Sequence, residues 1–352
     1  MFGLLRKNPR RTAMALVACT AVLLLIAFIR SRNTVRSELI QLQRDRGYRL
    51  VSVPMFDDRL YTISFADRTM KPSKPFLDQG SSETGDVSPD GTQFAFSHCL
   101  PPGFTHPSPD SQDCPGGSIL ATVRTDGTEL KNYQGLVDQG APICWSHDMS
   151  RVVTNLQDRR QGDSSSFEIL LAILELKTGQ IEVIDQGPDP FVFPQCWSPD
   201  DKQIAYTVNK DGGVQTTRIY DTRSKTSRDV ANGGFPTWSP DGNWIAYKFC
   251  PPSLSGCAYH RIRTSTGEDK VLFASDSGGA LFWSPDSRLV AYASMARLYE
   301  LRPSEYPLAF DFKRGVERLR VRRLDDNAET SFVNFEAGTM TWFEWVSGPP
   351  GK

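Results

Sequence analysis

One short phrase recurs five times along the chain, and this repeat constrains the fold more than any other feature of the sequence. The copies are Val87-Ser88-Pro89-Asp90-Gly91, Trp145-Ser146-His147-Asp148, Trp197-Ser198-Pro199-Asp200, Trp238-Ser239-Pro240-Asp241-Gly242 and Trp283-Ser284-Pro285-Asp286. An alternating apolar run, such as Gln203-Ile204-Ala205-Tyr206, follows each copy. Short strands that recur with a period of roughly 40 to 60 residues predict a β-propeller with one blade per repeat.

The phrase has the chemistry of a tight turn. Proline presets φ, the aspartate side chain can bond nearby backbone, and glycine accepts a positive φ. We therefore assign a turn-forming role, with calcium binding as the alternative, to the aspartates of the five copies: Asp90, Asp148, Asp200, Asp241 and Asp286. A second tight turn, such as Thr125-Asp126-Gly127, follows later in each repeat. Two turns per repeat predict blades of four antiparallel strands.

The Trp-Ser-Pro-Asp-Gly phrase with a following Ile-Ala-Tyr run resembles the WD-like repeat of TolB-type propellers. The same repeat occurs in the propeller parts of tricorn-like and dipeptidyl-peptidase-like proteases. The resemblance covers about residues 84–345. It implies a propeller but no single function, because this fold serves scaffolds, receptors and enzymes alike.

The repeats predict an all-β, six-bladed propeller over residues 47–346, followed by a flexible tail at 347–352. The stretch 338–342, which ends at Trp342, resembles the first strand of a sixth repeat. Residues 48–53, 59–65 and 75–78 read as the other three strands of that blade. We expect these N-terminal strands to pair with the C-terminal strand, because closing the ring removes an open sheet edge.

The first 46 residues carry the signals for location. Residues 13–29 are uncharged and mostly apolar, and at about 1.5 Å per residue such a helix can just cross a bilayer. They predict a single transmembrane helix after a basic cytoplasmic tail at 1–12. Residues 30–46 are predicted to form a helical stalk with Val35, Leu39 and Leu42 on one side. Lipidation at Cys19 is the alternative, which we disfavour because most of the apolar residues follow Cys19 rather than precede it.

Six of the seven cysteines lie in the propeller. The pairs Cys99/Cys114 and Cys250/Cys257 each bracket a loop between the second and third strands of a blade, which predicts two disulfides and an oxidising compartment. Cys144 and Cys196 lie in neighbouring first strands, where a bridge between blades is conceivable, but we favour buried reduced thiols. With the membrane segment, the cysteines predict a propeller in the bacterial periplasm.

Topology places all recognised tight turns on one face of the ring and the long loops on the other. The longest loop, 295–314, is rich in large side chains. It is our candidate surface for docking a partner, through Tyr299, Leu301, Tyr306, Leu308, Phe310 and Phe312.

We find no catalytic constellation, metal site or cofactor site in the sequence. The segment Asp276-Ser277-Gly278-Gly279 lies in a link between blades, and the four histidines lack metal-ligand spacing. A formal net charge of -1 gives no support for nucleic-acid binding. We therefore expect a membrane-anchored, non-enzymatic propeller that binds an envelope or membrane protein. The alternative is a propeller that senses a glycan or peptide, or an enzyme that uses the central channel.

Overall fold

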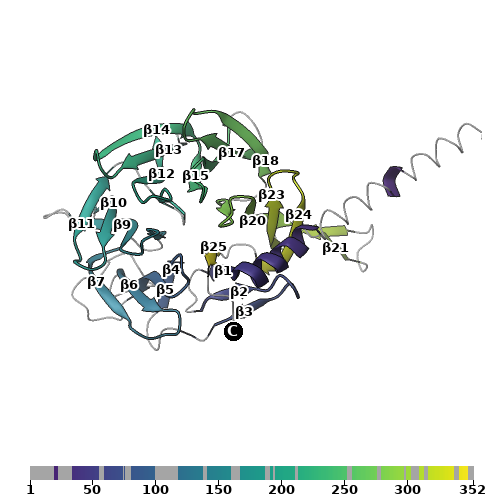
Figure 1. Cartoon of the computed structure of the whole chain (residues 1–352), viewed down its shortest axis with the longest axis horizontal. Helices are drawn as coiled ribbons and strands as arrows, with labels where there is room; N and C mark the ends of the chain where they lie inside the picture. The colour runs from purple at the N-terminus through teal and green to yellow at the C-terminus, as the bar shows by residue number, and fades with distance from the viewer. Residues whose placement is uncertain are drawn as a thin grey trace, which may run out of the picture.

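The computed structural model describes residues 20–22, 34–54, 59–73, 75, 81–99, 118–137, 141–159, 167–186, 191–192, 195–210, 213–251, 256–275, 279–296, 299–302, 309–312, 316–336 and 341–347. Within these ranges, six antiparallel sheets form a ring around a central axis (Figure 1). The chain is therefore the all-β, six-bladed propeller that the repeats predict. We number the blades 1 to 6 in chain order, the blade that closes the ring being blade 6.

Blades 1 to 3 occupy the first half of the ring. Blade 1 consists of β4 (Ser81–Val87), β5 (Gln93–Cys99), β6 (Ser118–Arg124) and β7 (Lys131–Leu136). Blade 2 consists of β8 (Cys144–Trp145), β9 (Arg151–Arg159), β10 (Phe167–Glu175) and β11 (Ile181–Asp185). Blade 3 consists of β12 (Gln203–Lys210), β13 (Val214–Asp221) and β14 (Thr226–Asn232). Isolated antiparallel bridges from Phe191 and Trp197 to β12 stand in the place of its first strand.

Blades 4 to 6 complete the ring. Blade 4 consists of β15 (Gly234–Trp238), β16 (Trp244–Phe249), β17 (Cys257–Arg263) and β18 (Asp269–Ser275). Blade 5 consists of β19 (Phe282–Trp283), β20 (Leu289–Ala296), β23 (Val316–Arg323) and β24 (Glu329–Glu336). Blade 6 consists of β25 (Thr341–Ser347), β1 (Tyr48–Pro54), β2 (Tyr61–Ile63) and β3 (Met70–Pro72).

The two ends of the propeller pair as predicted. The C-terminal strand β25 lies antiparallel to β1, with Val51 opposite Glu344. The predicted fourth strand at 75–78 is wrong, because β3 lies at Met70–Pro72. A tight turn closed by the bond from Ser64 N to Thr69 O (2.9 Å) returns the chain directly from β2, so the fourth strand begins earlier than the sequence suggested.

The second strands of the blades are packed on both faces. Ile204, Ala205 and Tyr206 of β12 have no exposed surface, although their side chains alternate between the two faces of the sheet. Each blade is stacked between two others, so both faces of an inner strand are covered. This explains why the Ile-Ala-Tyr run is apolar at consecutive positions rather than at every second one.

The five turn phrases form the turns that their chemistry predicts. In every copy the serine hydroxyl donates to the aspartate of the phrase, at 2.5–2.7 Å. The same aspartate accepts a backbone N–H two residues later, at 3.0–3.3 Å. The residue after the aspartate has a positive φ in all five copies: Gly91, Met149, Asp201, Gly242 and Ser287. The turn roles of Asp90, Asp148, Asp200, Asp241 and Asp286 thus rest on observed bonds.

The predicted stalk is packed against the propeller. Residues 34–46 form a helix whose Val35 and Leu39 are fully buried in the largest core cluster, with Leu42 packed against it. Glu38 of this helix accepts a hydrogen bond from Arg323 at 2.6 Å. The helix is therefore part of the folded domain rather than a free linker.

Of the predicted membrane segment, the structure describes only residues 20–22, which are helical and exposed. Among the described residues no helix is both long and apolar enough to span a bilayer. The rest of segment 13–29, the tail at 1–12 and the C-terminal residues 348–352 lie outside the described residues.

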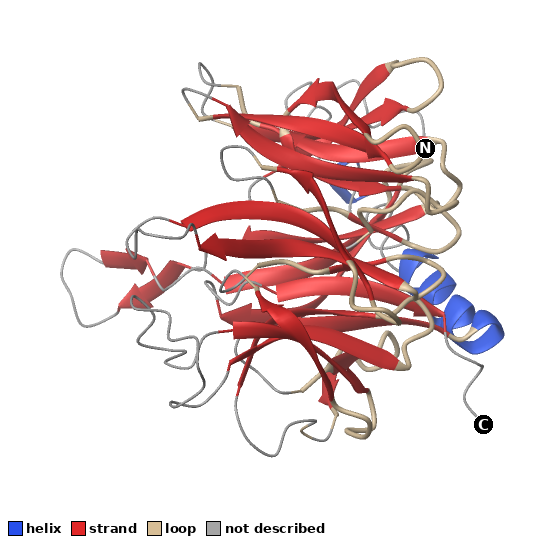
Figure 2. Cartoon of the chain, turned by 90° about the vertical axis from the view of Figure 1, so that its left-hand side faces the viewer, coloured by secondary structure: helices blue, strands red, loops and turns tan. Residues whose placement is uncertain are grey.

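A hairpin is inserted into blade 5 on the face opposite the turn phrases. It consists of β21 (Tyr299–Arg302) and β22 (Ala309–Phe312), and it leaves the blade at the end of β20 that is remote from the 284–288 turn. Figure 2 shows this hairpin projecting on one side of the ring and the helix of residues 34–46 on the other. Four of the six candidate docking residues, Tyr299, Leu301, Phe310 and Phe312, belong to its strands. Tyr306 and Leu308 lie outside the described residues.

Candidate functional site

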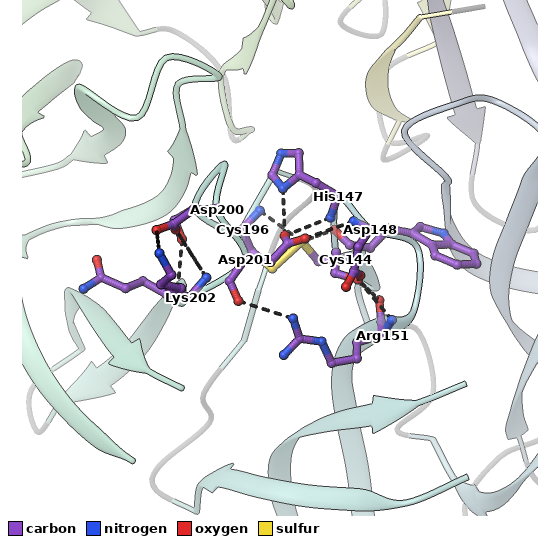
Figure 3. A network of polar contacts seen from close by, with 12 residues as sticks. Cys144, His147, Asp148, Arg151, Cys196, Asp200, Asp201 and Lys202 are labelled. Atoms are coloured by element: carbon purple, nitrogen blue, oxygen red, sulfur yellow. Dashed lines mark hydrogen bonds and ion pairs between the residues drawn. A yellow bond between two sulfur atoms is a disulfide. The ribbon is translucent and has the colours of Figure 1, made fainter. Parts of the chain in front are cut away.

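The turns of neighbouring blades are bonded to each other on the turn face. Asp201 of blade 3 accepts hydrogen bonds from the backbone N–H groups of His147 and Asp148 of blade 2, both at 2.9 Å. The imidazole of His147 also contacts this carboxylate at 2.9 Å, and Figure 3 shows the network. In blade 5, Ser287 accepts the N–H of Asp241 at 3.0 Å. Asp201 and Ser287, which replace the consensus glycine of the turn phrase, therefore bind one blade to the next through their side chains.

Two disulfides are present among the described cysteines, and they join Cys250 to Cys257 and Cys144 to Cys196. The first pair is the loop bridge that the sequence predicts. The second corrects our preference for reduced thiols: Cys144 and Cys196 meet in the core cluster between blades 2 and 3, and both residues are fully buried. Cys99 is also disulfide-bonded, and its predicted partner Cys114 lies outside the described residues.

The disulfide belongs to a ring of six equivalent positions, one from the first strand of each blade. Each position immediately precedes the residue at the aromatic place of the repeat, and its side chain is buried. The equivalence is visible in the indole bonds. Trp145, Trp283 and Trp345 each donate from Nε1 to the carbonyl of the ring position in the preceding blade, at 2.9–3.3 Å. The six positions are Asp86, Cys144, Cys196, Thr237, Phe282 and Glu344.

This equivalence also corrects the alignment of the sixth repeat. Trp345, and not Trp342, occupies the aromatic place in blade 6, because its indole makes the bond that Trp145 and Trp283 make in their own blades. Glu344 is thereby a ring position. Because blade 6 closes the ring of blades, the ring position next to Glu344 is Asp86 of blade 1.

A cavity of about 160 Å³ lies on the axis, at the turn-side end of the channel. Residues from all six blades line it. Five of the lining residues are tryptophans of the repeats: Trp145, Trp238 and Trp345, which keep 4–5% of their surface accessible, and the fully buried Trp197 and Trp283. Prolines of the turn phrases surround its outer end: Pro89, Pro199, Pro240 and Pro285. The turn face therefore contains a concave site.

Two carboxyl groups in this cavity are buried without a cationic partner. Asp86 is 3% exposed and Glu344 is 8% exposed. Asp86 Oδ1 and Glu344 Oε2 have no hydrogen-bond partner among the described residues. Asp86 Oδ2 accepts the N–H of Trp145 at 3.3 Å. None of the residues that line the cavity is a lysine or an arginine.

Burial raises the pKa of both carboxyl groups. For Asp86 the rise is opposed by the backbone N–H groups of Trp145 and Val87. The pKa of Glu344 is raised first by burial and then by the nearby charge of Asp86, while a hydrogen bond with Gln195 opposes the rise. Ionising both members of a buried pair of acids costs free energy, because the two negative charges repel and lose hydration, unless a positive charge binds between them.

Gln195 fixes one side of the pair. It has a positive φ of 63°, and its side-chain amide exchanges two hydrogen bonds with the backbone of Trp283, at 2.8 and 2.9 Å. Gln195 lies in blade 3 and Trp283 in blade 5, so this side chain reaches past blade 4 along the channel wall. An amide held at both ends keeps the environment of Glu344 fixed.

Sequence reasoning missed Asp86, Gln195 and Glu344. It aligned the last repeat on Trp342, three positions before the aromatic residue of blade 6. The sequence signal for the carboxyl pair was the residue directly before the aromatic position of each repeat. There Asp86 and Glu344 are acidic in two blades that become neighbours only when the ring closes.

The described histidines do not form catalytic pairs. His98 contacts Asn132, His147 contacts Asp201 and His260 contacts Asp269, at 2.9–3.3 Å. None of these partners is a serine, threonine or cysteine. In the described part of the chain, no three His, Cys, Asp or Glu residues are grouped so that they could hold a metal ion.

Comparison with known proteins identifies the fold. The chain resembles TolB of Acinetobacter baumannii with a TM-score of 0.60 and 16% identity, over 87% of this chain and 68% of that one. A putative TolB of Agrobacterium tumefaciens gives 0.55 and 14%, over 86% and 99%. An oligogalacturonate lyase in complex with manganese gives 0.50 and 14%, over 77% and 69%. The TolB-type propeller fold is thus shared with an enzyme as well.

Sequence relatives cover little of the chain, and no family model matches it. Coronin-7 of Rattus norvegicus is 44% identical over 61 residues, which are 17% of this chain and 6% of that protein. Coronin-7 of Bos taurus is 28% identical over 155 residues, 40% of this chain and 16% of that protein. The chain spans less than a fifth of the length of these curated relatives, so the matches do not indicate its function.

Proposed function

We propose that this chain is a non-enzymatic propeller anchored in a bacterial inner membrane by residues 13–29. Its propeller would lie in the periplasm and act as an interaction scaffold or as an accessory subunit of an envelope complex. The observation that carries this proposal is the sidedness of the domain. The hairpin of β21 and β22 lies on the face opposite the helix of residues 34–46 (Figure 2).

Sidedness matters because residues 34–46 directly follow the proposed membrane segment. A helix packed on the turn face, with Leu39 fully buried, holds that face toward the anchor. The hairpin face is then presented away from the membrane, where a partner can reach it. Inserted loops on a rigid scaffold commonly supply binding surfaces.

Two further features support the compartment and the absence of catalysis. The disulfides Cys144–Cys196 and Cys250–Cys257 suit an oxidising compartment such as the periplasm. The described histidines hydrogen-bond to one amide and two carboxyl groups rather than to a serine, threonine or cysteine that they could activate.

The hairpin can be removed without changing the blade. Strands β20 and β23 pair up to Ala296 opposite Val316, so a three-residue turn can replace residues 297–315. We expect the shortened full chain to keep the thermal midpoint of the wild type. Crosslinking in native membranes, followed by purification, should recover a partner with the wild type and not with the shortened chain. The same proteins recovered with both chains, or a wild type that purifies as a partner-free monomer, would refute the proposal.

The alternative function, ligand sensing or catalysis in the channel, is favoured by one observation. The cavity on the axis contains two buried carboxyl groups with unpartnered oxygens, Asp86 Oδ1 and Glu344 Oε2. That feature is independent of the hairpin.

A further inference from the structure

Without a bound cation, the ionised carboxyl pair of the channel cavity destabilises the folded chain. A buried carboxylate without a cation loses its hydration and gains nothing in return. Asp86 and Glu344 are each more than nine-tenths buried, and each has one buried oxygen without a hydrogen-bond partner among the described residues. The other titratable group in the cavity lining is His147, and its imidazole is occupied by Asp201 at 2.9 Å.

The walls around the pair are suited to an organic cation. Five tryptophans line the cavity; Trp145, Trp238 and Trp345 keep 4–5% of their surface accessible, whereas Trp197 and Trp283 are fully buried. Accessible indole surface attracts ammonium ions. A volume of about 160 Å³ is close to that of a cavity that holds a benzene-sized guest, about 150 Å³. The site can therefore take the charged end of a ligand and a short apolar stem.

We propose that this cavity binds an organic ammonium group, which the carboxylates of Asp86 and Glu344 hold between them. The ammonium donates hydrogen bonds to the carboxyl groups of Asp86 and Glu344, and its alkyl stem lies against the accessible surface of Trp145, Trp238 and Trp345. The site accepts the charged end of a small amine or of a lysine side chain in a partner protein. It does not depend on the hairpin, so it can stand or fail independently of the proposed scaffold role.

A divalent cation fits the same site less well. Calcium takes six to eight oxygen ligands, and the cavity lining offers two carboxyl groups, with the amide of Gln195 already engaged by the backbone of Trp283. No third His, Cys, Asp or Glu joins the pair among the residues that the structure describes. Tryptophan and proline walls replace hydration poorly for a metal ion but well for an alkylammonium.

The test titrates the full chain with n-butylammonium chloride at constant ionic strength and follows tryptophan fluorescence, since five of the seven tryptophans line the cavity. We expect saturable binding of n-butylammonium and none of n-butanol, its neutral analogue. Asp86→Asn and Glu344→Gln should each weaken binding at least 10-fold. Both changes keep side-chain size, and the amide oxygen that Asp86→Asn introduces can still accept the Trp145 N–H, so we expect both variants to fold.

The matched control is Glu129→Gln in blade 1, which removes one carboxylate whose side chain is 74% exposed. It should bind n-butylammonium as the wild type does. Affinity should also rise between pH 5 and pH 8, because n-butylammonium stays charged while the two carboxyl groups lose their protons. The rise should persist in His147→Gln, which removes the third titratable group of the lining.

The outcomes separate the candidates. Equal affinity in the wild type and in Glu344→Gln would overturn the proposal, and so would saturable binding of calcium chloride without any binding of n-butylammonium. If binding is confirmed, a lysine-containing peptide distinguishes the two sources of the ammonium group. A peptide that binds at least 10-fold more tightly than n-butylammonium indicates a protein partner, and equal affinity indicates a free amine.

Discussion

The disulfide between Cys144 and Cys196 should be the more important of the two observed bridges for stability. It joins blades 2 and 3 and closes a loop with a sequence separation of 52 residues, against 7 for Cys250–Cys257. The chain-entropy relation assigns about 4 kcal/mol to the longer loop and about 2 kcal/mol to the shorter one. Both residues of the longer bridge are fully buried, so their replacement also loses packing.

The perturbation is the pair of double variants Cys144→Ala/Cys196→Ala and Cys250→Ala/Cys257→Ala. Guanidinium unfolding of the full chain, followed by tryptophan fluorescence, measures the free energy of unfolding of each. We expect the first variant to lose about 4 kcal/mol or more and the second about 2 kcal/mol. The second variant is the matched control, since it also removes one bridge and two sulfurs.

Alkylation of the unfolded wild type without reductant supplies the independent readout. Cys144 and Cys196 should remain unmodified, and peptide mass spectrometry should recover them as one linked pair. Free thiols at both positions would refute the assignment of the bridge. A loss of stability in the Cys144→Ala/Cys196→Ala variant no larger than in its control would refute the loop argument.

Three further perturbations test the fold and the cavity. Gly85→Ala should destabilise the chain by about 3 kcal/mol or more in thermal unfolding, because an added Cβ would lie 2.2 Å from Phe94 Cζ and 2.6 Å from Ala95 O; an unchanged midpoint would contradict this packing. Leu39→Ala should cost about 2–5 kcal/mol and increase amide exchange along residues 34–46, since Leu39 is fully buried; exchange equal to that of the wild type would show that the helix does not depend on this contact. Glu344→Gln should raise the thermal midpoint more at pH 8 than at pH 5. The raised pKa of Glu344 means that the folded chain binds this proton more tightly than the unfolded chain does, so wild-type stability is full below the unfolded pKa and is lost as the pH rises toward the folded one. A stabilisation independent of pH would contradict this linkage.

The amino-acid sequence alone determined the repeat, the turn chemistry and the closure of the ring. These features depend on neighbouring residues or on a pattern that recurs within one chain. The bond from Ser239 to Asp241 is set by residues two positions apart, and the apolar run that follows Gln203 belongs to one strand. Such interactions are local, so a linear pattern contains them.

Only the tertiary structure decided which first strands lie next to each other around the channel. Asp86 and Glu344 are 258 positions apart in the chain, and they become neighbours because blade 6 is built from both ends of the domain. The packing of blade 2 against blade 3 joins Cys144 to Cys196 rather than leaving two buried thiols, and packing against the core turns a predicted stalk into a docked helix. Proximity of this kind comes from the ring geometry and the burial of side chains, and a single sequence does not record either one.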